Sequence, residues 1–235
     1  MNASARQDER RFFAWCAAFI VLLVFVGFSR TYFLHTFFQM PAPSSFLRIH
    51  GAVMSGWIMI YFIQTILVSV NRVAAHRTFG MIGAGYAALV VGFGTTATFL
   101  SARREVRGHT DAVFSFLNVF GLELAQMFLF ATIVVAAIWL RNRPEHHKRL
   151  MLLATLCILP NAIVRLFLRF FDTNLAFLSI WAALIVVIVL IDSLRNRRLH
   201  PAFGIGAAIA LTVMYVAQFA SRTQAWQLFA SHLVR

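Results

Sequence analysis

The chain has few charged residues and little of the chemistry that soluble enzymes use. Only 12% of its residues are charged, about half the ~25% that is usual in soluble domains. The two cysteines, Cys16 and Cys157, lie far apart inside apolar segments, so neither a disulfide framework nor a thiolate metal site is expected. The sequence contains no GxSxG, HExxH or P-loop motif, and it therefore offers no support for hydrolase or nucleophile chemistry.

Apolar residues, by contrast, are abundant and occur in long runs. Hydrophobic residues make up 60% of the chain, and the mean hydropathy is +0.77. No soluble fold buries that much apolar surface, so most of it must face lipid or other buried helices. Because backbone groups in lipid have no water to bond, the fold class expected is an all-α membrane bundle. A single transmembrane domain over 1–235 would contain seven helices, at about 12–28, 49–70, 79–100, 112–140, 150–168, 175–191 and 202–220.

Basic residues are concentrated in the short turns between these runs. The net charge of +13 would suit nucleic acid, but the basic residues do not share one polar face, and we exclude nucleic acid as a partner. The excess of arginine on one side places the N-terminus in the cytoplasm. The six later helices then form three hairpins with cytoplasmic turns. The turn residues expected to contact lipid headgroups and set the topology are Arg72, Arg77, Arg143, Lys148, Arg149, Arg197 and Arg198.

Three of these turns share a pattern in which arginine precedes a histidine that opens the next apolar helix. The histidines are His76, His147 and His200. In the simpler interpretation the turns snorkel to the interface and bind headgroups. In the alternative, the helix ends gather into one site, since three imidazoles can hold a metal ion and two can hold a haem. His50, at the other side of the membrane, completes the candidate set of haem or metal ligands.

The segment 49–70 has a polar and aromatic stripe. His50, Met54, Trp57, Tyr61 and Gln64 recur at steps of three and four, which places them on one face of a helix. Polar groups in a membrane helix face the bundle interior because lipid cannot bond them. The stripe therefore lines either a hydrogen-bonded packing seam or a cavity.

Glu123 is the strongest single candidate for a functional residue. A carboxylate at that depth costs at least ~2.5 kcal/mol unless it is paired or protonated. Arg165 is its natural partner, and Pro160 should loosen the helix nearby. The two residues could form a structural ion pair or a functional site, and an ionisable residue within the membrane favours the second. The predicted ligand pocket joins them to His50, Trp57, Tyr61, Gln64, Asn118, Gln126 and Asn161.

Four short motifs give the chain a family resemblance. They are HG at 50–51, HR at 76–77, PEHHKRLM at 144–151 and HP at 200–201. On these elements the chain resembles a large group of bacterial seven-helix integral membrane proteins of the domain-of-unknown-function type. The resemblance covers nearly all of the chain beyond the first helix. It implies the architecture and supplies no mechanism.

Three hypotheses on function follow from these observations. The leading one is a multi-pass protein of the bacterial inner membrane that binds a b-type haem, a quinone or a small ligand within its helix bundle. A second is a small-molecule carrier or receptor with an outward-facing polar pocket. A third is an accessory structural subunit of a larger membrane complex, in which the partners are the lipid bilayer and other membrane proteins. The sequence does not establish whether the chain is an enzyme.

Overall fold

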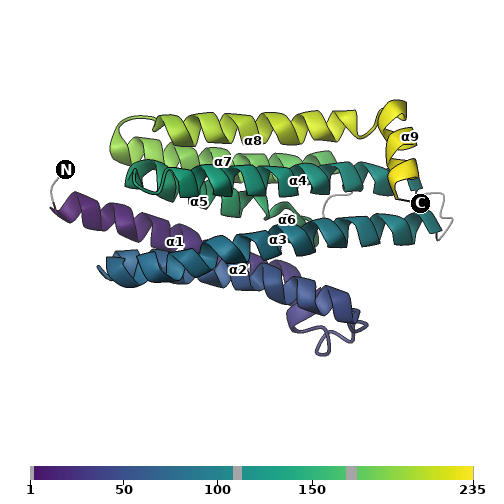
Figure 1. Ribbon diagram of the computed structural model, residues 1–235, viewed down its shortest axis with the longest axis horizontal. Helices are drawn as coiled ribbons and strands as arrows, with labels where there is room; N and C mark the ends of the chain where they lie inside the picture. The colour runs from purple at the N-terminus through teal and green to yellow at the C-terminus, as the bar shows by residue number, and fades with distance from the viewer. Residues whose placement is uncertain (1–2, 108–112, 168–173, 235) are drawn as a thin grey trace.

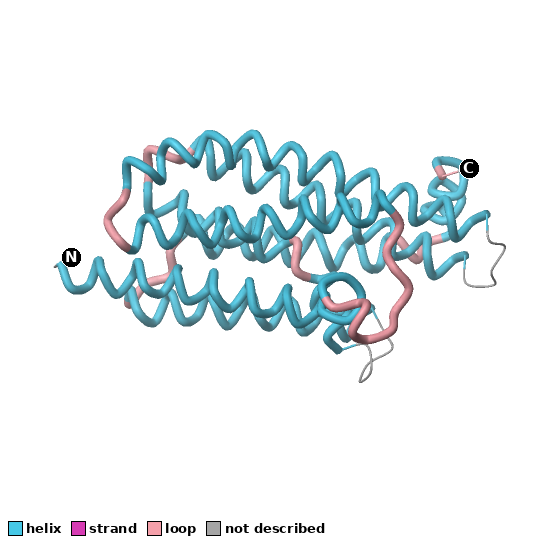
Figure 2. The backbone as a smooth tube through the Cα atoms, turned by 90° about the horizontal axis from the view of Figure 1, so that it is seen from below, coloured by secondary structure: helices cyan, strands magenta, loops and turns pink. Residues whose placement is uncertain are grey.

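The computed structural model describes residues 3–107, 113–167 and 174–234, and these residues are almost entirely helical (Figures 1 and 2). They contain no β-strand. The elements are α1 (Ala3–Phe28), a π-helical turn η1 (Ser29–Phe33), α2 (Ser45–Ser69), α3 (Val73–Arg107), α4 (Val113–Trp139), α5 (Pro144–Cys157), α6 (Pro160–Phe167), α7 (Asn174–Asn196), α8 (Pro201–Ala220) and α9 (Gln224–Leu233). The all-α prediction is confirmed.

Six helices are long and apolar enough to cross a membrane: α1, α2, α3, α4, α7 and α8. The fifth predicted span is broken into α5 and α6, which meet at a 45° bend. Counting this pair as one span gives seven. Several helices are longer than the apolar runs predicted. Helix α1 begins at Ala3, and α3 continues to Arg107. A helix propagates past the apolar window wherever its backbone bonds can continue.

The break in the fifth span has a local cause. Pro160 has no N–H, so the carbonyl of Leu156, four residues earlier, loses its helical donor. The indole Nε1 of Trp181 in α7 donates to that carbonyl at 2.8 Å. Trp181 is fully buried. The neighbouring helix therefore supplies the hydrogen bond that proline removes, which allows the bend to persist within an apolar bundle.

The bundle has two distinct ends, seen at left and right in Figure 1. The turn end carries the N-terminus and the turns that connect α2 to α3, α4 to α5 and α7 to α8. The loop end carries η1, residues 34–44 and α9. Helix α8 packs against α4 and α5, and α7 packs against α6 and α8. Which end faces the cytoplasm stays a prediction.

The core is apolar, and much of the outer surface is apolar too. Trp57, Phe130, Leu152 and Trp181 are among the most buried side chains. Large exposed apolar side chains include Trp139, which is 81% exposed. An apolar exterior of this kind on long helices suits contact with lipid.

Candidate functional site

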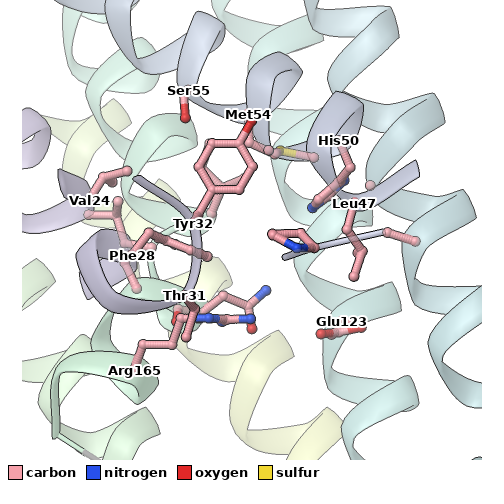
Figure 3. Close-up of a pocket in the computed structure, with 18 of the residues that line it drawn as sticks. Val24, Phe28, Thr31, Tyr32, Leu47, His50, Met54, Ser55, Glu123 and Arg165 are labelled. Atoms are coloured by element: carbon pink, nitrogen blue, oxygen red, sulfur yellow. The ribbon is translucent and has the colours of Figure 1, made fainter. Parts of the chain in front are cut away.

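A cavity of about 330 Å³ lies inside the loop end of the bundle (Figure 3). Its walls come from α1, η1, α2, α3, α4 and the broken α5–α6 span. Most of the lining is apolar. The polar lining includes five residues that the sequence predicted for a ligand pocket: His50, Glu123, Gln126, Asn161 and Arg165. They lie on three different elements, α2, α4 and α6, and the fold brings them to a single space. We call it the loop-end cavity.

Glu123 and Arg165 enter this cavity from different helices without forming an ion pair (Figure 3). The guanidinium of Arg165 donates to the backbone carbonyl of Asn161 at 3.0 Å and lies 4.5 Å from the ring centre of Phe28. Thr98, on the same cavity wall, donates its hydroxyl to the carbonyl of Gly94 at 3.1 Å. No described carboxylate lies within salt-bridge distance of Arg165. The predicted direct pairing of Glu123 with Arg165 is therefore absent, and both charges remain available to the cavity.

Two further polar side chains on the cavity wall have hydrogen-bonding capacity to spare. Nδ1 of His50 is buried and has no partner among the described residues. Gln126 is only 4% exposed, and within the described chain its amide has no hydrogen-bond partner. An unpaired polar group in a dry environment is costly. A ligand that bonded these groups would remove that cost.

Tyr32 of η1 closes one side of the loop-end cavity. Its hydroxyl donates to the carbonyl of Arg48 at 2.7 Å, and its ring lies against Gly51 so closely that a Cβ at that position would collide with it. Glycine at position 51 therefore allows the η1 segment to pack over the start of α2. The HG motif thus places an imidazole beside a position that must remain small.

The stripe on α2 is divided between two cavities. Met54 and His50 line the loop-end cavity, whereas Tyr61 and Gln64 line a second cavity of about 270 Å³ at the turn end. Trp57 separates the two. It is 1% exposed, donates to Thr155 Oγ1 at 3.3 Å, and lines the second space. The single pocket predicted from the stripe is therefore two cavities. We call the second the turn-end cavity.

Asn118 lies in neither cavity, although the sequence placed it in the pocket. Its Oδ1 accepts a hydrogen bond from Ser221, in the turn between α8 and α9. Close by, the indole of Trp226 in α9 donates to the carbonyl of Leu117 at 2.9 Å. Asn118 thus helps to attach α9, a helix that the sequence reading missed because it follows the last apolar run.

The four candidate haem or metal histidines do not meet in one site. His76 faces His147, with ring centroids 6.3 Å apart. His200 faces His146 instead, at 4.7 Å, and His50 lines the loop-end cavity. Among the described residues no group of three His, Cys, Asp or Glu side chains could hold a metal ion. The three-histidine arrangement is therefore not found.

The turn end contains a buried charge cluster that was not predicted from the sequence. Arg149, predicted to contact headgroups, is 1% exposed, and its guanidinium is surrounded by carboxylates. It donates to Asp192 at 2.7 and 3.0 Å, to Glu145 at 2.7 Å and to Glu9 at 3.0 Å. Lys148 adds contacts to Glu9 at 2.6 Å and Glu145 at 2.8 Å. Arg149 thus holds α1, α5 and α7 together. The remaining residues of the predicted headgroup set are exposed: Arg72, Arg77, Arg143, Arg197 and Arg198.

Comparison of the chain with protein-family models, with curated proteins and with solved structures found no match. The assignment of function therefore depends on the residues of the two cavities.

Proposed function

We propose that this protein binds a small amphipathic molecule of the quinone class in the loop-end cavity. The observation that supports the proposal is an arginine and a partly buried glutamate that line one cavity without forming an ion pair with each other. Intramembrane ionisable groups are rare, and they usually mark a substrate or proton pathway. A ligand that both accepts and donates hydrogen bonds would satisfy the two groups together.

A quinone head group matches the chemistry of the wall. Its carbonyl oxygens would accept hydrogen bonds from Arg165 and His50, and the hydroxyl of the reduced form would donate to Glu123. The apolar lining would hold the ring and the start of an isoprenoid tail. The volume of about 330 Å³ falls within the ~300–1,000 Å³ of typical ligand pockets. Among its described lining residues this cavity has one imidazole, His50, and a bis-histidine haem needs two, so quinone is favoured over haem here.

The wider setting of the proposal is the one predicted from the sequence. The protein would lie in the bacterial inner membrane with its N-terminus in the cytoplasm, which places the loop-end cavity toward the outside. A carrier or receptor would use the same cavity, and ligand movement across vesicles would distinguish it from a static binding protein. No contact among the described residues favours an accessory subunit over these alternatives.

The test is binding of ubiquinone-1 and menadione to detergent-purified protein by isothermal titration calorimetry. Arg165→Gln and Glu123→Gln should each weaken binding by roughly 10- to 100-fold, because a hydrogen bond to a charged group contributes about 1.5–3 kcal/mol. Arg104→Gln is the matched control, since Arg104 is exposed and outside the cavity, and it should leave binding unchanged. The proposal fails if the unmodified protein binds neither quinone.

A further inference from the structure

We infer that the turn-end cavity is a second cofactor site, which takes a b-type haem between His76 and His147. This inference is independent of the quinone proposal, because it concerns different residues in a different cavity. It selects one pair from the histidines of the repeated turns and leaves His50 and His200 without a role in coordination.

The two imidazoles face each other at a separation suited to one metal ion. Two metal–nitrogen bonds of about 2 Å, with half an imidazole ring on each side, place the ring centroids about 6 Å apart. The centroids of His76 and His147 are 6.3 Å apart. They come from different helices, since His76 lies in the first turn of α3 and His147 in the first turn of α5. A bis-histidine haem is held by two imidazoles in this way.

The second nitrogen of each ring already has a neighbour that would orient it. Nδ1 of His147 lies 2.8 Å from the carbonyl oxygen of Ala137, and metal-bound histidines usually donate their other ring N–H to such an acceptor. Nδ1 of His76 accepts a hydrogen bond from the side-chain amide nitrogen of Gln64, whose oxygen accepts from the N–H of Gly80 at 2.9 Å. In both rings Nε2 is left for the metal. This gives Gln64, part of the predicted stripe, a positioning role.

The cavity wall suits a flat apolar ring. Phe13, Trp57 and Tyr61 contribute aromatic side chains, and Gly80 and Gly83 replace side chains on the facing surface of α3. A Cβ at Gly80 would meet only the Gln64 amide, at 4.0 Å, so this part of the wall is open. The volume of about 270 Å³ lies just below the usual range of ligand pockets.

The rim carries the charge that propionates require. Arg10, Arg77, Arg141 and Lys148 all line the turn-end cavity. Among its described lining residues the only carboxylate is Glu9, which is already bonded to Lys148 and Arg149. Arginine and lysine form strong charge-assisted bonds with carboxylates. An apolar centre with a basic rim is the complement of a tetrapyrrole that has two acidic side chains.

The other histidine pair at this end does not share these features. The rings of His146 and His200 are 4.7 Å apart, closer than the separation that an intervening metal ion requires, and neither residue lines the turn-end cavity. A site for a metal ion alone would need further protein ligands, and the described residues supply no third one. Haem is the group that two imidazoles suffice to hold.

The experiment is an oxidised and dithionite-reduced absorption spectrum of protein purified from a haem-replete host, followed by titration with hemin. The unmodified protein should show a Soret band and sharp reduced α and β bands, or acquire them at one hemin per chain. His76→Ala and His147→Ala should each reduce haem occupancy at least tenfold. His200→Ala is the control and should keep the spectrum.

A second measurement separates loss of a ligand from loss of the fold. Imidazole added to His147→Gly should restore the low-spin spectrum, because the free base can occupy the vacated position. Two results overturn the inference: unmodified protein that takes up no hemin, or haem retained by both the His76 and the His147 variants. Neither result would affect quinone binding at Arg165, so failures of the two proposals are distinguishable.

Discussion

Two arginines lie in the broken α5–α6 span, and their surroundings are opposite. Arg149 is bonded to three carboxylates on three elements, whereas Arg165 has no described carboxylate partner and lies beside a cavity. The carboxylates of the protein therefore neutralise the charge of Arg149, and this residue stabilises the fold. The charge of Arg165 would be neutralised only if another molecule supplied an acceptor. A charged side chain on a cavity wall indicates a binding site when its own chain supplies no partner of opposite charge.

The largest effect is expected when a carboxylate partner of Arg149 is removed, which tests whether this arginine stabilises the fold. Asp192→Asn should lower the free energy of unfolding by about 3 kcal/mol or more, because loss of one member of a buried ion pair leaves an uncompensated charge. Thermal and denaturant unfolding in detergent would measure it. Glu145→Gln is the control, since the Glu145 side chain is 46% exposed and its loss should cost less. Equal effects of the two variants would contradict the cluster's assigned role.

A neutral buried contact should have the next largest effect. Trp181→Phe removes the indole donor to the Leu156 carbonyl, which keeps the backbone N–H of Leu159 as a donor at 3.2 Å, so we expect a loss of about 0.5–1.5 kcal/mol, the net contribution of one hydrogen bond. The same substitution at Trp139, which is 81% exposed, should leave the unfolding transition unchanged. If both variants melted like the parent, the bend in the fifth span would not depend on the indole.

Arg165→Gln should change stability by less than about 1 kcal/mol, although this residue lines the loop-end cavity. Its side chain has no ion pair to lose, and its removal relieves the cost of a charge within the membrane. Unfolding without ligand would measure this effect. A loss as large as that of Asp192→Asn would show that Arg165, too, serves the fold.

The smallest effect concerns pH at the turn end. His200 lies between α7 and α8, and burial, followed by the positive charges of Arg149 and His146, lowers its pKa. A lowered histidine pKa means that the unfolded chain binds the proton more readily. The stability that this group contributes is therefore complete above its ordinary value of about 6.5 and is lost as pH falls toward the folded value. The midpoint temperature should be lower at pH 5.5 than at 7.5, and His200→Gln should reduce that difference.

The sequence predicted the loop-end cavity better than it predicted the charge cluster, for a physical reason. Glu123 and Arg165 stand inside apolar runs, where any charge is conspicuous. Arg149 stands in a basic turn, where arginine is common. Its partners Glu9 and Asp192 are 140 and 43 residues away, and only the fold reveals that they meet. The chain has only eight acidic residues. Their scarcity was the signal from which an ion pair for each carboxylate could have been predicted.

The stripe on α2 shows a second limit. Its period correctly indicated one helix face, and all five residues line cavities. Periodicity does not predict which residues of other helices pack against that face. Here Trp57 bonds to Thr155 and separates the two cavities along the stripe. Asn118 was misplaced for a similar reason, because its partner Ser221 follows the last apolar run.

The hydrogen bond from Trp181 to Leu156 also bears on how the chain is made. During synthesis α5 and α6 leave the ribosome before α7, and each is shorter than the ~20 residues that cross a bilayer. Until residue 181 emerges, the Leu156 carbonyl lacks the indole donor. We expect the fifth segment to remain mobile at the translocon until the sixth arrives, so that the two are released into lipid as a unit.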